Sequence, residues 1–170
     1  MLQLADATMM AELAEVLAKD GDTALPSDDY PLLLIPRRAN DMMNSIGRMN
    51  PKLTARRSHN PAFLNPDTMA ELGLEDGDVI RIRSQHGEIP GVVEAEARLR
   101  PGTVSMSHGF GNNPGEDEDV FAQGGCTSRL MDARAEYDPI FGQPRMGAVP
   151  VRVTKEVSSK ATREFADAEA

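Results

Sequence analysis

The sequence predicts a mainly β protein, a barrel of about six short strands joined by long loops. Short apolar or alternating segments recur along the chain, and 14 Gly and 12 Pro among 170 residues separate them. Only one segment, near the N-terminus, has the apolar period of a longer helix. Several short strands, one small helix and long loops are typical of a β-barrel with inserted loops.

The first 29 residues are expected to lie outside this barrel. Residues 6–19 predict an amphipathic helix, because Asp6 can cap it and Met9, Leu13 and Leu17 recur at helical spacing. Residues 20–29, with Gly, Pro, Ser and several Asp, are typical of a linker. We therefore divide the chain into three parts, which are an N-terminal helix and acidic linker over 1–29, a barrel domain over 30–154, and a polar tail over 155–170.

The barrel domain is expected to open with a buried strand over residues 30–35, an apolar run that ends at Pro36. Residues 37–58 have no clean period and predict a long irregular connection, with one helical turn over 41–46. Loops of this length in compact domains are often functional. Residues 61–65 predict a second strand. We expect the methionines of the long connection to pack in the core; they are Met42, Met43 and Met49.

A short helix is expected after Asn65, which can cap it, with Pro66 at its first position and Gly73 at its end. The residues predicted to face the core from this helix are Met69, Ala70 and Leu72.

Four further strands are expected after this helix. Residues 79–83 alternate apolar and charged side chains, as a half-buried strand does. Residues 92–97 predict the returning strand, and residues 103–107 follow the turn that contains Gly102. Residues 108–148 are rich in Gly, Asn and Pro and predict loops. The last strand is expected at 149–153.

Composition excludes several classes of protein. The single cysteine, Cys126, excludes an internal disulfide, a Cys-ligated zinc site and an iron–sulfur cluster held by this chain alone, and a packed free thiol is expected. The longest apolar run, Leu32 to Ile35, is too short to cross a bilayer. No signal peptide is recognised, so we expect a cytoplasmic protein. The net charge of −9 argues against general binding to a nucleic-acid backbone.

The negative charge is unevenly spread. Residues 1–30 hold seven acidic residues and one basic residue, whereas residues 31–65 hold six basic residues and one acidic residue. The basic residues of that second segment are Arg37, Arg38, Arg48, Lys52, Arg56 and Arg57. Two interpretations stay open from charge alone, a solvated loop or a pocket for an anion, since guanidinium groups bind phosphates through paired hydrogen bonds.

Four blocks of sequence, taken in order, carry a resemblance to a known family. The longest begins at Asn65 and reads NPDTMAELGLEDGD, followed by VIRIRS and LRPGTV. Before it stands PLLLIPRR over 31–38, and after it stand SHGFG over 107–111 and YDPIFGQPR over 137–145. Together they resemble the C-terminal dinucleotide-binding domain of molybdopterin oxidoreductases, the dimethyl-sulfoxide-reductase superfamily, over about 120 residues. The resemblance implies a double-psi β-barrel with one or two short helices.

The resemblance implies a molybdopterin guanine dinucleotide as the cofactor. Phosphates need cationic or backbone N–H donors, and ring edges need amide or hydroxyl groups. Carried over position by position, the family pattern assigns to the cofactor Arg37, Arg38, Asn44, Ser45, His108, Gly109, Phe110, Ser128 and Arg145. Where the family usually has an Asn, this chain has Ser128, which reaches less far. No residue of this chain is expected to be catalytic or to bind the metal, whose ligand in the family lies in an upstream domain.

The resemblance implies a cap domain that holds this cofactor in a larger molybdenum or tungsten oxidoreductase, either with upstream domains or with a separate catalytic chain. The isolated chain is not expected to catalyse a reaction, nor to bind nucleic acid or membranes. The alternative is a double-psi barrel that serves as a protein-interaction adaptor without cofactor. It would explain residues 65–104 but neither the arginine pair nor the His-Gly-Phe-Gly loop. A self-processing decarboxylase on the same barrel is disfavoured, because the chain has no Gly-Ser dipeptide to form a pyruvoyl group.

Overall fold

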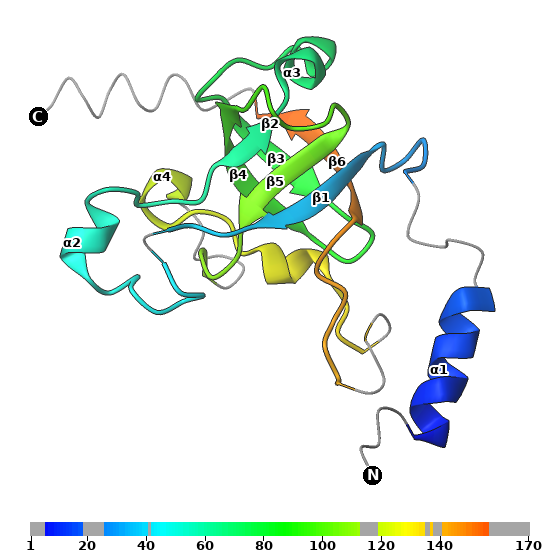
Figure 1. Cartoon of the computed structure of the whole chain (residues 1–170). Coiled ribbons are helices and arrows are strands. Elements are labelled where there is room, and N and C mark those ends of the chain that lie inside the picture. The colour runs from blue at the N-terminus through cyan, green and yellow to red at the C-terminus, as the bar shows by residue number, and fades with distance from the viewer. Residues whose placement is uncertain are drawn as a thin grey trace, which may run out of the picture.

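The computed structural model of the 170-residue chain describes residues 6–18, 26–40, 42–112, 119–134, 137 and 141–156. Most of the predicted tail and residues 20–25 of the predicted linker lie outside them. Six strands occur in the described part (Figure 1), and they are β1 Leu32–Arg37, β2 Ala62–Leu64, β3 Val79–Arg83, β4 Glu88–Ala95, β5 Thr103–Ser107 and β6 Val149–Lys155. The helices are short except for the first, and they are α1 Ala7–Ala18, α2 Pro51–Thr54, α3 Pro66–Leu72, α4 Val120–Gln123 and the 3₁₀ turn η1 Thr127–Leu130.

The strands close into a barrel in the order β1-β5-β2-β4-β3-β6. Two neighbouring pairs, β1 with β5 and β2 with β4, are parallel, and the remaining pairs are antiparallel. The last strand closes the barrel, because β6 pairs with β1 on one side and with β3 on the other. The mainly β class predicted from the sequence is confirmed.

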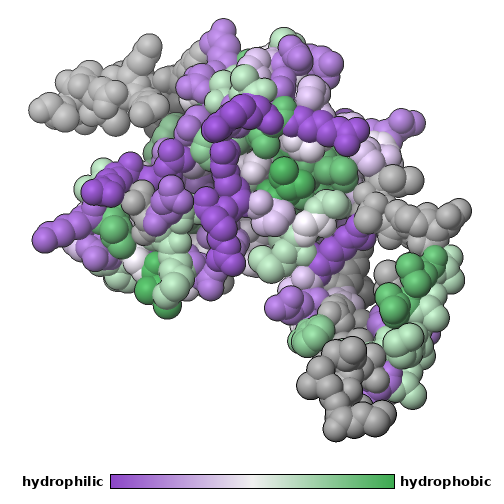
Figure 2. Space-filling model, in the orientation of Figure 1, coloured by the Kyte–Doolittle hydropathy of each residue, from purple (hydrophilic) through white to green (hydrophobic). Residues whose placement is uncertain are grey.

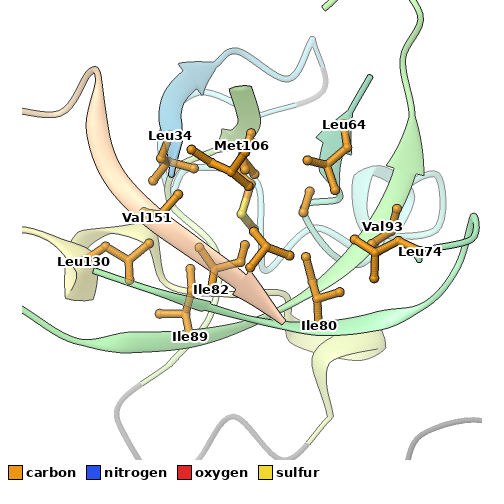
Figure 3. Close-up of a cluster of buried hydrophobic side chains, with 14 of the residues drawn as sticks. Leu34, Leu64, Leu74, Ile80, Ile82, Ile89, Val93, Met106, Leu130 and Val151 are labelled. Atoms are coloured by element: carbon orange, nitrogen blue, oxygen red, sulfur yellow. The ribbon is translucent and has the colours of Figure 1, made fainter. Parts of the chain in front are cut away.

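The barrel interior is filled by branched aliphatic side chains from the strands (Figure 3). Ile80, Ile82, Val104 and Val151 are fully buried, and Leu130 of η1 closes the interior from outside the barrel sheet. Their burial follows from the pleat, since alternate residues of each strand face inward. The charged residues between them, such as Arg81 in β3, are exposed.

Two of the predicted strand boundaries were wrong beside a proline. The first strand runs through Pro36 to Arg37 rather than ending before Pro36. β6 pairs with β1 only over Leu32–Leu34, so at Pro36 the strand has a partner on one side and a missing N–H is tolerated. Likewise β4 begins at Glu88, before Pro90, rather than at residue 92, and it ends at Ala95.

The helix α3 has the predicted limits but a partly different inner face. Asn65 caps it, and Gly73 ends it with a φ of 64° in the left-handed region. Met69 is buried as predicted, whereas Ala70 is exposed and Thr68 is buried in its place. The hydroxyl of Thr68 accepts a hydrogen bond from the N–H of Gly102 at 3.0 Å, which explains why a polar residue faces inward here.

The predicted packing of the methionines in the long connection was wrong. Met43 is 64% exposed and Met49 is 95% exposed. The predicted helical turn over residues 41–46 is also absent from the described residues, since Met43 and Ile46 instead form an isolated antiparallel bridge. Hydrophobic side chains are exposed along α1 as well (Figure 2), where Leu17 is 74% exposed.

Candidate functional site

The carboxyl ends of β1 and β5 bring two predicted site segments together. These strands are parallel neighbours, and Arg37 at the end of β1 is in register with Ser107 at the end of β5. The connection that follows β1 and the loop that follows β5 therefore start side by side, on the side of the barrel where α2 and α4 lie (Figure 1). Residues 70 positions apart in sequence meet at this edge for that reason.

A hollow of about 200 Å³ lies at this edge. Its walls come from the end of β1, the loop after it, β2 and the loop after β5. The lining residues are Arg37, Arg38, Ala39, Asn40, Met42, Arg57, Asn60, Phe63, Ser107 and Phe110. Three arginines among ten lining residues make this hollow strongly basic in a chain whose net charge is −9.

The guanidinium of Arg37 is held between an aromatic ring and a carboxylate. It lies 3.9 Å from the ring centroid of Phe63, and its Nη2 is 3.0 Å from Oε2 of Glu96. The guanidinium of Arg57 is 5.6 Å from the centroid of the same ring. Cation–π contacts of this kind fix the orientation of the guanidinium plane. The remaining Nη1 of Arg37 is buried and has no hydrogen-bond partner in the described structure.

Glu96 is held by two arginines. Hydrogen bonds from Arg98, and then from Arg37, lower the pKa of Glu96 from 4.5 to about 2. The carboxylate accepts from Nε of Arg98 at 2.9 Å and from Nη2 of Arg98 at 2.9 Å. Glu96 is therefore ionised at neutral pH and holds one edge of Arg37 in place.

Asn44 joins Arg38 to His108. Its side-chain oxygen Oδ1 accepts from Nη1 of Arg38 at 2.7 Å and from Nε2 of His108 at 2.7 Å. Because that oxygen can only accept, Nε2 of His108 carries the proton. Asn44 has a φ of 56°, in the left-handed region that Asn adopts more readily than most residues. Three sequence-predicted residues from two loops therefore form one hydrogen-bonded group.

Gly109 and Phe110 complete the loop after β5. Gly109 has a φ of 85°, and a Cβ added there would come 2.5 Å from the carbonyl oxygen of Asn44. Only glycine allows this approach of the two loops. Phe110 is 2% exposed, and its side chain forms part of the hollow's wall.

Of the nine predicted residues, only Arg37, Arg38 and Phe110 line the hollow. Asn44, His108 and Gly109 stand beside it through the contacts described above, and the other three lie elsewhere. Ser45 lines a neighbouring, more open depression together with Met43 and Ile46. Ser128 is exposed on η1, and Arg145 is half-buried in the segment that precedes β6. Neither Ser128 nor Arg145 lines either of these two depressions.

Sequence reasoning missed seven of the ten lining residues, and three of them, Asn60, Phe63 and Arg57, shape the wall. The amide of Asn60 is buried and fully used, since Nδ2 donates to Ser107 O at 2.6 Å and Gly125 O at 2.9 Å, and Oδ1 accepts from Gly125 N at 2.8 Å. Asn60 thus ties the end of β5 to the segment before η1. Arg57 belongs to the basic segment seen in the sequence, but no local pattern marks Asn60 or Phe63.

A family model matches residues 32–150, described as "Molydopterin dinucleotide binding domain". This chain belongs to that family. The match covers both strands that carry the hollow and every residue assigned to the cofactor. The cofactor of the domain is therefore a molybdopterin guanine dinucleotide, which the domain holds as a cofactor-binding cap. The adaptor alternative is not favoured.

Curated relatives are much longer than this chain. A tetrathionate reductase chain of Salmonella typhimurium is 30% identical over 119 residues, which are 69% of this chain and 11% of that protein. A sulfite dehydrogenase chain of Allochromatium vinosum is 28% identical over 141 residues, 74% of this chain and 15% of that protein. Trimethylamine-N-oxide reductase of Haemophilus influenzae is 26% identical over 109 residues, 61% of this chain and 13% of that protein. This chain thus spans only a small part of the length of each of these relatives.

The fold agrees with a solved structure. Acetylene hydratase from Pelobacter acetylenicus superposes with a TM-score of 0.62 and 21% identity, over 92% of this chain and 21% of that one. The closed six-stranded barrel of the described residues is a double-psi β-barrel, as predicted. Within the described residues, no helix has the length and apolarity that a membrane span requires, and no group of three or more His, Cys, Asp or Glu is placed to hold a metal ion.

Proposed function

We propose that the hollow at the ends of β1 and β5 holds the anionic part of the dinucleotide, within a larger molybdenum or tungsten oxidoreductase. The observation that carries this proposal is the gathering of the guanidinium groups of Arg37, Arg38 and Arg57 at one concave surface. Guanidinium groups match the geometry of phosphate oxygens and keep their charge at every physiological pH.

Two features of the described residues fit such a ligand. Arg37 has a buried Nη1 without a partner, while its Nη2 is fixed by Glu96. A buried donor left unpaired is costly, so a ligand oxygen at this position would be strongly favoured. The second feature is Gly109, whose missing side chain lets the loop after β5 lie against the backbone of Asn44, so that His108 and Arg38 share Asn44 beside the hollow.

Individual roles follow from these contacts. Arg37 and Arg38 would bind the phosphates, with Arg57 adding positive charge. Asn44 uses its oxygen to hold Arg38 and His108, which leaves its Nδ2 as a donor for the ligand.

Phe110 and Gly109 would form the wall against the rings. Ser45, Ser128 and Arg145 would meet more distant parts of an extended dinucleotide. When bound, the cofactor supplies the metal and the redox chemistry, and this chain supplies its binding.

The remainder of the oxidoreductase is part of the proposal. Since this chain spans 11% of the tetrathionate reductase chain and 15% of the sulfite dehydrogenase chain, the catalytic domains would be supplied upstream or by a separate chain. We propose the division at residues 29 and 154 for the cap domain, which the family match over 32–150 supports. The isolated chain is expected to show no turnover.

We also propose a cytoplasmic location, with which the free thiol of Cys126 is compatible.

The test removes the arginine pair in the assembled oxidoreductase. Replacing Arg37 and Arg38 by Ala should lower the cofactor content at least about tenfold, because two charge-assisted interactions are lost. The content is measured by the fluorescence of the oxidised pterin per mole of protein. The matched control replaces Arg81 and Arg83, two exposed arginines of β3 away from the hollow, and should retain the cofactor.

The same variants are compared by urea unfolding of the 170-residue chain. Arg37 packs on Phe63 and pairs with Glu96, so its loss should cost about 1–2 kcal/mol without unfolding the barrel. Full cofactor content in the arginine-pair variant would refute the proposal, as would an equal loss of cofactor in the control.

A further inference from the structure

Two buried polar atoms without a protein partner belong to residues that line the same small cavity. They are Nδ1 of His108 and Oγ1 of Thr127, at the start of η1. The cavity measures about 10 Å³. The rest of its lining is apolar and includes Leu34, Met106 and Met131. Thr127 itself is only 4% exposed, so bulk water does not reach its hydroxyl.

Leaving both atoms unpaired would be costly, since a buried polar group without a hydrogen bond has lost its hydration and gained no interaction in return. Native proteins satisfy such groups with protein partners or with ordered water. A cavity of about 10–15 Å³ is the smallest that holds one water molecule, and that molecule needs at least two polar partners. The cavity beside His108 has the volume for one water and two residues whose polar atoms need one.

We propose that one ordered water molecule occupies this cavity and bridges Thr127 Oγ1 to His108 Nδ1. The directions of these hydrogen bonds follow from the hydrogen bond that the other ring nitrogen of His108, Nε2, makes. Nε2 of His108 donates to Asn44 Oδ1, and in the tautomer that belongs to this proposal Nδ1 has a lone pair and accepts. The water donates one hydrogen to Nδ1 and accepts the hydroxyl hydrogen of Thr127.

The water connects three segments that are far apart in the sequence. From Thr127 the hydrogen bonds run through the water to His108, then to Asn44, which also accepts from Arg38. Thr127 is therefore a positioning residue, because it acts on Arg38 only through other groups. The water site itself stands independently of the cofactor, whereas the consequence for Arg38 rests on the proposed function.

The first test examines the 170-residue chain without cofactor. Thr127→Val removes the hydroxyl at nearly constant shape, and Thr127→Ser retains it as the matched control. In the wild type we expect ordered density in the cavity of a crystal structure and a ¹⁵N resonance of His108 Nδ1 typical of a hydrogen-bonded acceptor. Thr127→Val should lose the density and move that resonance to the position of an unbonded acceptor nitrogen. Thr127→Ser should retain both.

The second test measures the consequence for the ligand, with GDP as a probe of the dinucleotide's phosphates. Loss of one bridging hydrogen bond should weaken GDP binding by Thr127→Val about fivefold, and Thr127→Ser should bind within about twofold of the wild type. The wild type and both variants could all fail to bind GDP while the cavity density and the His108 Nδ1 resonance behave as expected. In that case the proposed function fails and the water site stands.

Three outcomes would overturn the water site. One is a protonated or unbonded Nδ1 in the wild type. Another is a Thr127→Val variant whose His108 resonances match those of the wild type, because the hydroxyl would then have no part in holding the ring. The third is an empty cavity in a crystal structure that resolves other ordered waters.

Discussion

Gly109 shows how closely the loop after β5 approaches the loop after β1. Replacing it by Ala would put a Cβ 2.5 Å from Asn44 O and would also strain a φ of 85°. Gly102 is the matched control, since its φ is 78° but no atom lies within 4 Å of an added Cβ. We expect Gly109→Ala to lower the free energy of unfolding by about 1–3 kcal/mol more than Gly102→Ala, because only the former adds a steric clash to the strain.

Urea unfolding of the two glycine variants measures this difference. The ¹⁵N–¹H resonance of His108 Nε2 reports at the same time whether Asn44 has moved. Equal costs for the two variants, with an unchanged His108 resonance, would show that the loops yield easily at this point and that close approach is not required.

Glu96 makes the free energy of unfolding depend on pH in the acid range. Its pKa is lowered from 4.5 to about 2 by hydrogen bonds from Arg98 and then Arg37. A carboxylate with a lowered pKa stabilises the folded state above its unfolded value, and this stabilisation is lost as the pH falls from about 4.5 towards 2. The stability advantage of the wild type over Glu96→Gln should therefore shrink across this range.

Urea unfolding at a series of pH values checks the prediction. Arg98→Ala removes the larger of the two causes, so in that variant the loss should span a narrower range of pH that ends at a higher value. A wild type that unfolds with the same pH dependence as Glu96→Gln would contradict the assignment of this group.

At the scale of elements, α3 is capped by Asn65, whose side chain also forms a hydrogen bond with the turn that contains Leu99. Oδ1 of Asn65 accepts from Asp67 N at 2.8 Å, and Nδ2 donates to Leu99 O at 2.7 Å. Asn65→Ala should therefore cost about 2–3 kcal/mol, from a lost cap and an unpaired carbonyl. Asn50 caps the short, exposed α2 through Lys52 N, and Asn50→Ala should cost about 1 kcal/mol or less.

The two capping variants are compared by urea unfolding, with Asn65→Asp as an intermediate case that keeps the acceptor and loses the donor. If Asn65→Ala and Asn50→Ala cost the same, the bond to Leu99 contributes nothing and the capping role alone accounts for the effect.

The elements that sequence reasoning predicted well are those with local causes. The limits of α3 follow from Asn65, Pro66 and Gly73, whose conformational preferences act within a few residues. The start of β4 could not be predicted from local preferences, because Pro90 and Gly91 are residue types that usually indicate a turn. Gly91 lies in the strand because an added Cβ would be 3.2 Å from Ile82 Cδ1, a tertiary reason that no local pattern shows.

The site was predictable where a family pattern marks its residues and unpredictable where only the fold creates the contact. The resemblance named Arg37, Arg38 and His108, whose loops meet in the folded chain. It did not name Phe63. The ring of Phe63 contacts Arg37 only because the barrel places β5 between β1 and β2. Asn60 was missed for the same reason, since its partners lie 47 and 65 residues away in the chain.

At the scale of the whole molecule, the hollow depends on closure of the barrel. β1, which carries Arg37, is held by β5 on one side and by β6 on the other, and β6 in turn pairs with β3. Opening the barrel at β6 would release one edge of β1. We therefore expect the site and the barrel to unfold in a single cooperative step, as small single domains usually do.

Reciprocal substitutions on β6 test this coupling. Val151 is fully buried opposite Leu32, whereas Thr154 of the same strand is exposed. Val151→Thr puts a hydroxyl into the core and should lower the free energy of unfolding by about 1–3 kcal/mol, while Thr154→Val should change it by about 0.5 kcal/mol or less. Urea titrations followed by far-UV circular dichroism and by the His108 Nε2 resonance should have coincident midpoints, and both should shift together in Val151→Thr. A His108 resonance lost at lower urea than the sheet signal would show that the site opens while the barrel stays closed.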